Sequence, residues 1–281
     1  MKFIDLSMPI WDGAGYGEVL PIPNTPVKFF EYATYEWNGI RRTEMKIDDE
    51  SGSPFMTPWQ WFPHEIGPAL VPGRLFDWTL DKVPLERLIL RDTVVLDVPG
   101  GDRYEITGDD IDSAVATADY HDGDDVLVRT SWATSQKAFE MGDRYVLDGP
   151  SWSYDACIRM AAIMEERHSG IVMTDTPLIM TPLYQGWGWS AGPERMIPKP
   201  KPWPSIEARE RKMDLPPGTI SPAPPEVGRG GYLELMAKTI AICKCLVNAN
   251  LISRGRIKMM ILPLLIKSGG ASPCRFIAVE D

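Results

Sequence analysis

The alternation of strand and helix patterns in the middle of the chain constrains its fold more than any other feature. Short apolar runs at 94–98, 125–130 and 170–174 are typical of buried strands. Between them, one helix is predicted to begin after a Thr107 cap and another after a Ser153 cap. Strands separated by single helices at this spacing predict an α/β fold.

Further elements flank this alternating region. Residues 29–37 are aromatic and alternate with polar residues, so they predict a strand with one buried face. Asn38-Gly39 indicates a hairpin turn, after which the chain returns as the partner strand. The remaining predicted elements are a helix at 232–249 and strands at 258–266 and 274–279.

The composition excludes several kinds of partner. The net charge of −10 argues against nucleic acid, since phosphate binding needs a basic face. No stretch reaches the ~18 apolar residues of a membrane span, and an acid at position 5 interrupts the start before any apolar signal region.

The four cysteines lack the spacing of a zinc site and are interpreted as reduced thiols of a cytoplasmic protein. Length alone allows one large domain or two small ones.

The loop at 50–61 carries the most specific pattern in the chain. Its spacing resembles the HxGTHxDxPxH metal-binding signature of the cyclase family, which includes bacterial kynurenine formamidase and isatin hydrolase. Gly52 and Pro58 fall on the Gly and Pro of that signature, and Ser53 takes the place of its Thr. The four ligand-type positions carry Glu50, Pro54, Met56 and Gln60.

Other stretches extend the resemblance. Residues 123–132 match the family's GDxVLxRTGW strand, while 149–151 and 174–178 match its GxS helix start and GxDTPS strand end. The resemblance implies a single domain over 1–281, with mixed β-sheets in a barrel-like core flanked by helices. A Pro- and Trp-rich stretch at about 183–231 is interpreted as an insertion. The resemblance also implies a homodimer or higher homo-oligomer with the active site near the subunit boundary.

Two later metal-site positions of the family, a His and a Glu, fall on Tyr232 and Lys244. Of all the replaced positions only Glu50 offers a good ligand for a hard metal ion, and one carboxylate does not hold Zn²⁺ or Mn²⁺ against water. We therefore expect neither a metal nor another cofactor. Because a buried lysine needs a partner, our hypothesis is that Glu50 pairs with Lys244 near the former metal position.

This hypothesis gives five residues candidate catalytic roles. Glu50 is the candidate general base, Lys244 would stabilise a developing oxyanion or enolate, and Tyr232 would donate a proton. Gln60 can only orient substrate or water, because an amide does not transfer protons at neutral pH, and His64 is the candidate substitute for acid–base work. The alternatives are a purely structural ion pair, a tyrosine packed on the core and a surface histidine.

Aromatic and basic residues are the candidates for substrate binding. Trp59, Trp61 and Trp132 suit the walls of a pocket for an aromatic or otherwise flat molecule. Arg129 and Arg42 are candidates to bind a substrate carboxylate. Each of the five also has an ordinary interpretation as a core or surface residue.

Three functions follow, all with a small-molecule partner. The first is a metal-independent cyclase-family enzyme that uses acid–base catalysis for ring closure, ring opening, elimination or isomerisation. The second is a metal-dependent amide or lactone hydrolase of the kynurenine formamidase type with atypical ligands, which Zn²⁺ or Mn²⁺ would activate and chelators would inhibit. The third is a non-catalytic paralogue that binds a ligand without turnover.

Overall fold

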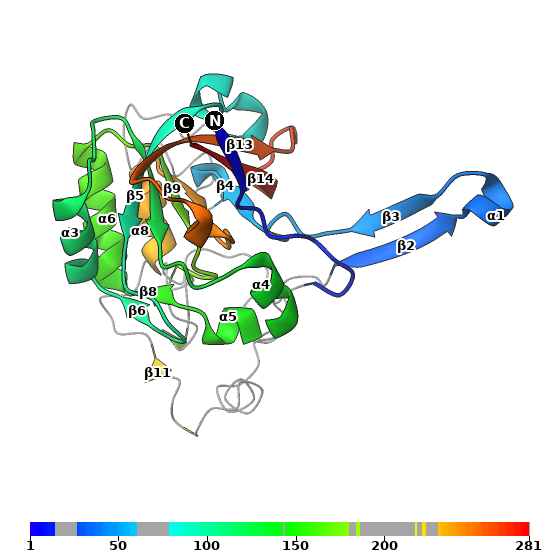
Figure 1. The fold of residues 1–281 in the computed structure, drawn as a ribbon, viewed down its shortest axis with the longest axis horizontal. Coiled ribbons are helices and arrows are strands. Elements are labelled where there is room, and N and C mark those ends of the chain that lie inside the picture. Colours follow the sequence, from blue (N-terminus) through cyan, green and yellow to red (C-terminus); the bar gives the residue numbers. More distant parts are fainter. Residues whose placement is uncertain are drawn as a thin grey trace, which may run out of the picture.

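A closed barrel of strands forms the centre of the molecule (Figure 1). The computed structural model describes residues 1–14, 27–60, 79–142, 144–179, 184–185, 217, 221–222 and 230–280. Strands follow one another in the order β14, β13, β5, β7, β9, β12 and β4, and β4 closes the ring by pairing with β14. Their bounds are Pro54–Met56 (β4), Arg91–Asp97 (β5), Asp125–Arg129 (β7), Ile171–Thr174 (β9), Ala241–Cys243 (β12), Arg256–Pro263 (β13) and Ala271–Glu280 (β14). The predicted α/β fold with a barrel-like core of mixed sheet is confirmed.

Four neighbouring barrel strands, β5, β7, β9 and β12, run parallel to one another. The other three, β13, β14 and β4, are antiparallel to their neighbours. Outside the ring, β1 (Lys2–Asp5) pairs with the last part of β14. The carboxyl ends of the four parallel strands therefore meet at one end of the barrel, the place where open α/β sheets carry their ligand sites.

Alternate side chains of the strands face the inside and the outside of the barrel. Every barrel strand contributes to one buried apolar cluster, with Phe55, Val95, Leu127, Met173, Cys243, Met259 and Phe276 among its members. Their sequence neighbours, such as Val94, Val126 and Ile242, belong to a second cluster that also contains helix residues. Because side chains alternate along a strand, the first cluster fills the barrel and the second holds the helices on its outer wall.

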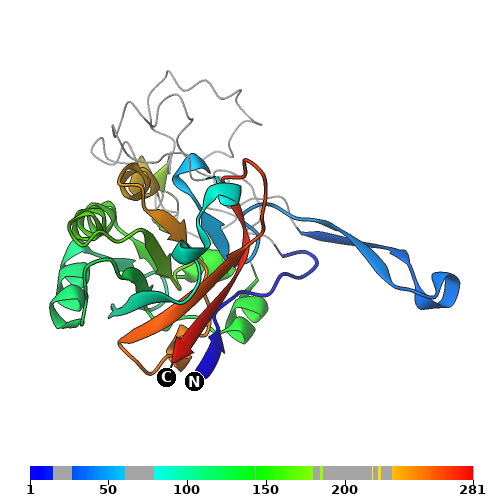
Figure 2. The same cartoon turned by 90° about the horizontal axis from the view of Figure 1, so that it is seen from above.

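Three helices cover one side of the barrel, with α6 between α3 and α8 (Figures 1 and 2). Their bounds are Gly108–Thr117 (α3), Tyr154–Glu166 (α6) and Gly230–Ala237 (α8). The two predicted helix caps are confirmed. Thr107 forms a reciprocal capping box with Asp110, and the Ser153 hydroxyl accepts a hydrogen bond from the Ala156 N–H. No helix of the described residues is long and apolar enough to span a bilayer.

The prediction of one helix over 232–249 is wrong. Helix α8 ends at Ala237, Thr239 turns the chain with a φ of 61°, and β12 follows. Residues 240–243 are buried, and β12 pairs with β9 on one side and β4 on the other. A short apolar run fits a buried strand as well as a helix, so the sequence pattern could not separate them. The correction places Lys244 at the end of a barrel strand.

A long hairpin arm extends from the body (Figures 1 and 2). It consists of β2 (Lys28–Ala33), the short helix α1 (Tyr35–Asn38) and β3 (Arg42–Lys46). The predicted hairpin is confirmed, but the strand expected over 29–37 ends at Ala33, and the tip is the helical turn α1, which Gly39 ends in the left-handed region at a φ of 69°. The predicted buried face is wrong, because every β2 residue except Ala33 is exposed.

Several short elements connect these parts. They are the 3-10 turns Pro58–Gln60, Leu80–Lys82, Leu85–Arg87 and Ala249–Leu251, the strands Glu105–Ile106 (β6), Ser151–Trp152 (β8), Tyr184–Gln185 (β10) and Ser221–Pro222 (β11), and the helices Ser135–Met141 (α4) and Arg144–Asp148 (α5). The predicted insertion at 183–231 lies outside the described residues except for β10, β11, residue 217 and the first two residues of α8. Within it, β10 and β11 pair in parallel.

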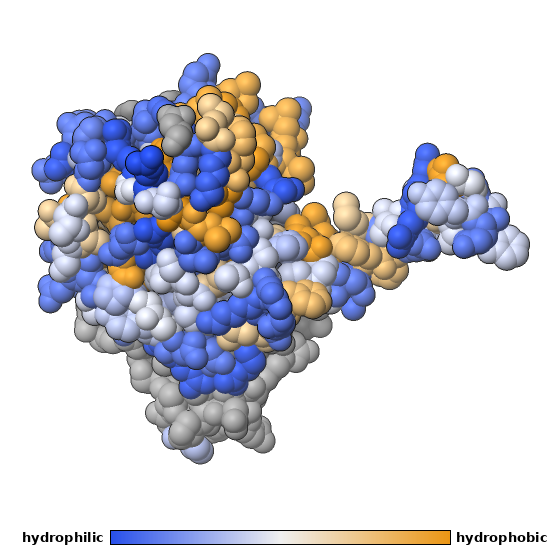
Figure 3. All heavy atoms as spheres, viewed as in Figure 1, coloured by the Kyte–Doolittle hydropathy of each residue, from blue (hydrophilic) through white to orange (hydrophobic). Residues whose placement is uncertain are grey.

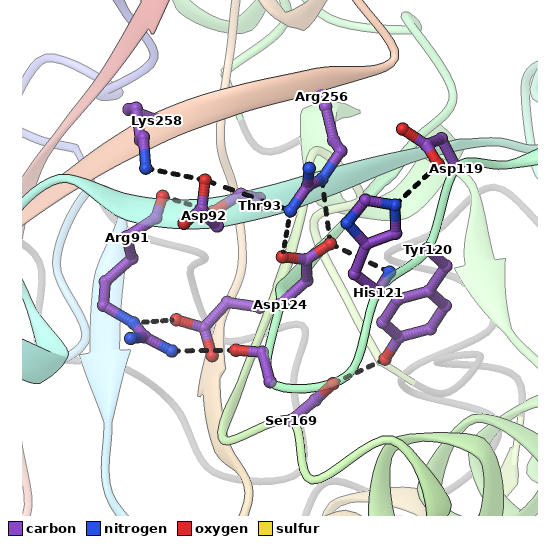
Figure 4. A network of polar contacts seen from close by, with 12 residues as sticks. Arg91, Asp92, Thr93, Asp119, Tyr120, His121, Asp124, Ser169, Arg256 and Lys258 are labelled. Atoms are coloured by element: carbon purple, nitrogen blue, oxygen red, sulfur yellow. Dashed lines mark hydrogen bonds and ion pairs between the residues drawn. The ribbon is translucent and has the colours of Figure 1, made fainter.

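Charged side chains join the strands at the end of the barrel where the parallel strands begin (Figure 4). Arg91 Nε donates to Asp125 Oδ2 at 3.0 Å, and Asp125 Oδ1 accepts from two backbone N–H groups at the start of β9. Asp124 accepts from the Arg256 guanidinium through both oxygens, at 2.7 and 3.0 Å. This network ties together the starts of β5, β7, β9 and β13.

Candidate functional site

A buried ion pair lies at the opposite end, where the parallel strands finish. Lys244 follows β12 directly, and its side chain is only 2% exposed. Its Nζ is 2.8 Å from Oε2 of Glu50, whose side chain is 20% exposed. The sequence hypothesis that these two residues meet therefore agrees with the geometry.

The turn that carries Glu50 is held by its own hydrogen bonds. The Ser51 N–H donates to the Asp48 carbonyl at 3.1 Å, and the Asp48 N–H donates to the Ser51 hydroxyl at 3.0 Å. The Glu50 N–H donates to Asp48 Oδ1 at 2.9 Å. Glu50 thus sits on a compact turn between the arm and β4, and its backbone position is defined locally.

Ser53 connects this loop to the strand end that carries Lys244. Its buried hydroxyl donates to the Cys245 carbonyl at 2.7 Å and accepts from the Met8 N–H at 2.8 Å. Together with the pairing of β4 and β12, this hydroxyl holds the two halves of the ion pair near each other. Sequence reasoning missed this role, although the match of Ser53 to a family threonine marked a position where a hydroxyl is needed.

Gln60 binds the other oxygen of the same carboxylate. Its Nε2 donates to Glu50 Oε1 at 2.9 Å. This contact fixes the amide orientation, because the reverse orientation would place two acceptors against each other. The Gln60 Oε1 atom is buried and has no hydrogen-bond partner within the described part of the chain. It is an unsatisfied acceptor beside the ion pair.

Tyr232 lies on the third side of the pair, in the first turn of α8. Its ring centroid is 5.7 Å from Lys244 Nζ, and its hydroxyl accepts from the Ile179 N–H at 3.4 Å. Burial raises the pKa of Tyr232 to about 12, against the lowering effect of the Lys244 charge. The phenol therefore keeps its proton at neutral pH.

Two opposing effects act on Lys244. Burial is the largest single effect and lowers the pKa of its ammonium, but Glu50, Tyr232 and Cys245 together outweigh it, so the pKa of Lys244 lies above its usual value. At neutral pH Lys244 is therefore an ammonium, and it lies in contact with Glu50. The site offers a negative oxygen, a positive donor and a protonated phenol within one small volume.

The other predicted site residues have different surroundings. Trp59 is half-buried in the 3-10 turn beside Gln60, and Arg42 lies on the exposed arm. Trp132 donates its indole N–H to Asp102 at 2.9 Å and packs 5.3 Å from the Tyr145 ring, measured between centroids. His64 and Trp61 lie outside the described residues.

The Arg129 guanidinium is engaged by other parts of the chain. Its Nε and one terminal nitrogen donate to both oxygens of Asp97, at 2.6 and 2.7 Å. The other terminal nitrogen donates to the Ile252 carbonyl at 2.8 Å. These partners give Arg129 a structural role, and its binding of a substrate carboxylate stays a prediction.

Asp175 supports the loop after β7. Oδ1 accepts from the Thr130 N–H and hydroxyl, both at 2.9 Å, and Oδ2 accepts from the Ser131 N–H at 2.7 Å. Ser131 has a left-handed φ of 57°, which these contacts hold in place. Burial raises the pKa of Asp175 to about 6, in spite of these hydrogen bonds, which lower it.

The donor atoms around Glu50 do not suit a divalent metal ion. Both Glu50 oxygens bond to donors, and the Lys244 ammonium would repel a second cation at this distance. No group of three or more His, Cys, Asp or Glu among the described residues is arranged to hold a metal. The described residues therefore do not fit a metal of the kind that the sequence resemblance implies.

Comparison with solved structures identifies the fold. Isatin hydrolase A from Labrenzia aggregata, bound to benzyl benzoate, superposes with a TM-score of 0.66 at 19% identity, over 100% of this chain and 94% of the other. The chain has the isatin hydrolase fold. Isatin hydrolase A from Ralstonia solanacearum superposes with a TM-score of 0.66 at 16% identity, over 99% of this chain and 92% of the other. A potential metal-dependent hydrolase with cyclase activity superposes with a TM-score of 0.57 at 17% identity, over 100% of this chain and 99% of the other.

The cyclase-type fold expected from the resemblance is thereby confirmed. No family model matches the chain, and no curated protein matches it by sequence. At these identities the likeness establishes the architecture and leaves the chemistry to the residues of the site.

Proposed function

We propose that this protein is a metal-independent enzyme that uses acid–base catalysis on a small aromatic or carboxylate-bearing molecule. The reaction would be a ring opening or closure, an elimination or an isomerisation. The observation that carries the proposal is the 2.8 Å contact between the buried Lys244 ammonium and Glu50. Charged groups that are buried and paired at the carboxyl ends of parallel strands are frequent at functional sites.

Each member of the site has a role in this proposal. Glu50 accepts a substrate proton, because each carboxylate oxygen has a second lone pair beside the one engaged by Lys244 or Gln60. Lys244 stabilises the negative charge that develops when the proton leaves. Tyr232 is protonated at neutral pH and donates a proton to the departing or newly formed group.

The proposed substrate class rests on the unsatisfied acceptor and on the aromatic surroundings. Gln60 Oε1 suits an N–H or O–H donor of the substrate. Trp59 stands beside it in the same turn and gives a flat, apolar contact. The isatin hydrolase neighbours were solved with benzyl benzoate and with the product analogue thioisatinate, both of which are small molecules.

A second candidate is a metal-dependent amide or lactone hydrolase. The description of one structural neighbour as a potential metal-dependent hydrolase favours it, and the bonding of both Glu50 oxygens argues against it. Metal analysis of protein purified without chelators separates the two candidates. One equivalent of tightly bound Zn²⁺ or Mn²⁺, with activity lost in a chelator, would reject metal independence.

The catalytic roles are tested with Glu50→Gln and Lys244→Met against a panel of aromatic lactams, lactones and esters. Lys238→Met is the matched control, because Lys238 forms a surface ion pair with Glu165 on the outer helices. We expect kcat to fall at least about 100-fold in the two site variants and to stay unchanged in the control. Intact ligand binding in all three proteins, without turnover in the wild type, would support the non-catalytic paralogue.

A further inference from the structure

One residue of the connection between β13 and β14 lies against the turn that carries Gln60. Gly270 directly precedes β14, and Ala271, the first residue of β14, is opposite Met56 of β4. The pairing of these strands therefore places Gly270 opposite the 3-10 turn that follows β4. The outer side of the connection is apolar, since Leu265 is 84% exposed, and Figure 3 shows hydrophobic surface over this upper part of the body. Gly270 belongs to its inner side.

Gly270 contacts both ends of this turn. Its carbonyl accepts hydrogen bonds from the Thr57 N–H and hydroxyl, at 2.8 and 3.0 Å. Its α-carbon lies so close to Gln60 that a β-carbon at position 270 would be 2.8 Å from the Gln60 Cα and 2.9 Å from both its N and its Cβ. Carbon atoms in ordinary contact are about 3.5–4.0 Å apart. A residue with a side chain therefore does not fit at position 270 while the turn keeps its place.

The backbone conformation of Gly270 does not explain why the position holds glycine. Its φ lies outside the left-handed region, so another residue could adopt the same conformation. Its neighbour Gly269 has different surroundings, because a β-carbon there would meet only side-chain atoms of Ile266 and Leu80, each at 3.0 Å. The close approach to the Gln60 backbone is thus particular to position 270.

The position of Gln60 bears directly on the ion pair. Gln60 Nε2 donates to Glu50 Oε1 at 2.9 Å, and Glu50 Oε2 is 2.8 Å from Lys244 Nζ. A β-carbon at position 270 would have to displace the Gln60 backbone by about 0.7 Å to reach ordinary contact. A displacement of that size is enough to take a 2.9 Å contact out of hydrogen-bond range. It would also move Gln60 Oε1, the buried acceptor without a partner in the described residues.

We propose that Gly270 is a positioning residue of the candidate site. The absence of a side chain at position 270 sets the place of Gln60 against Glu50 and, with it, the place of the Oε1 acceptor. Gly270 acts through Gln60 and not on the substrate itself. The inference rests on the proposed function, because the place of Gln60 affects turnover only if the ion pair beside it is catalytic.

Steady-state kinetics of the full chain test the proposal, with a substrate from the panel of aromatic lactams, lactones and esters. Gly270→Ala is expected to lower kcat about 10- to 100-fold, because a displacement approaching 1 Å in a catalytic site has effects of this size. Gly269→Ala is the matched control, since it makes the same substitution at the next position without approaching Gln60. The control is expected to keep the kcat of the wild type.

A double-mutant cycle separates positioning from a purely structural role. In a Gln60→Ala background the amide is already absent, so Gly270→Ala is expected to lower kcat no further. A structural role of Gly270 would lower kcat by the same factor in both backgrounds. That result, or an equal loss of kcat in Gly269→Ala, would overturn the proposal.

NMR of the Gln60 side-chain amide tests the positioning without any turnover. Its N–H signals, assigned by their loss in Gln60→Ala, are expected to shift and to exchange faster with solvent in Gly270→Ala, and to stay in place in Gly269→Ala. Thr57→Val removes one of the two hydrogen bonds to the Gly270 carbonyl and is expected to give a smaller shift, which keeps the test open if Gly270→Ala does not fold.

The two measurements also distinguish failure of this inference from failure of the proposed function. Gln60 signals that stay in place in both Gly270→Ala and Thr57→Val would overturn the positioning role. Displaced signals without turnover of any substrate in the wild type would uphold the positioning of Gln60 and reject the proposed catalysis.

Discussion

The two ends of the barrel both contain buried charges, but they use them differently. At the end where the parallel strands begin, Asp125 bonds to Arg91 and to two backbone N–H groups, and Asp124 engages Arg256 through both oxygens (Figure 4). At the other end, Lys244 and Glu50 form a pair whose neighbour Gln60 has an acceptor without a partner in the described residues.

The comparison separates a structural network from a candidate site. The network is saturated, since its carboxylates receive hydrogen bonds from several strands at once, and it has little capacity left for a ligand. The site has the same kinds of charge with bonding capacity to spare. Buried charge alone therefore does not indicate function, and the unfilled hydrogen-bonding capacity beside it is the better indicator.

The largest effect is expected in the network. Asp125→Ala leaves the Arg91 guanidinium and two backbone N–H groups without their acceptor, and should lower the free energy of unfolding by about 4 kcal/mol. Urea unfolding at neutral pH measures it. Asp92→Ala is the control from the same network, because Asp92 is half exposed and pairs with Lys258 at 2.7 Å, so less than about 1 kcal/mol is expected. Equal losses of unfolding free energy in the two variants would contradict a special contribution of the buried Asp125.

The site pair should respond unequally to removal of its two halves. Glu50→Gln leaves the ammonium of Lys244 buried without a counter-charge, and should lower the unfolding free energy by about 3 kcal/mol. Lys244→Met leaves Glu50 with Gln60 and partial exposure, so about 1–2 kcal/mol is expected. The double variant should match Lys244→Met, which a double-mutant cycle by urea unfolding would reveal. Additive losses would mean that the pair contributes no coupling.

Asp175 gives a test through pH. The folded pKa of about 6 lies above the ordinary value of 3.8, so the folded state holds this proton more tightly than the unfolded state. The resulting stability is complete below about pH 4 and is lost as the pH rises through about 6. Relative to Asp175→Asn, the wild type should lose up to about 3 kcal/mol between these limits. Denaturant titrations at several pH values measure the difference, and parallel curves for the two proteins would contradict it.

The smallest effect is expected at Ser53. Ser53→Ala removes a hydroxyl that bonds to both Met8 and Cys245, and should lower the unfolding free energy by about 1–2 kcal/mol. Because this hydroxyl helps to hold Glu50 near Lys244, kcat should fall by more than the loss of stability explains. Ser53→Thr keeps the hydroxyl and serves as the control. Normal turnover in Ser53→Ala would show that the Ser53 contact is not needed for catalysis.

Local signals predicted part of this structure. The helix starts at Thr107 and Ser153 could be read from sequence because capping depends on residues within one turn. The meeting of Glu50 and Lys244 came from the spacing of family motifs far apart in the chain. It persisted although the helix predicted for Lys244 was wrong, because the match fixed the position of the residue and not its secondary structure.

The remaining features depend on contacts that no local pattern contains. Residues 240–243 are a strand because β9 and β4 pair with them from both sides. The arm has aromatic alternation without a buried face, since its residues leave the body. The contact of Gln60 with Glu50 and that of Ser53 with Cys245 both join separate segments, and only the closed barrel brings those segments together.

The ten-residue strand β14 has a consequence for how the molecule is made. It pairs with β13, with β4 and with β1, so neither the ring nor the first strand is complete until this last strand is present. On the ribosome the earlier strands must wait, with their apolar faces exposed, until β14 has been synthesised. Truncations within residues 271–280 should therefore prevent folding altogether, and the nascent chain should depend on chaperones more than its size suggests.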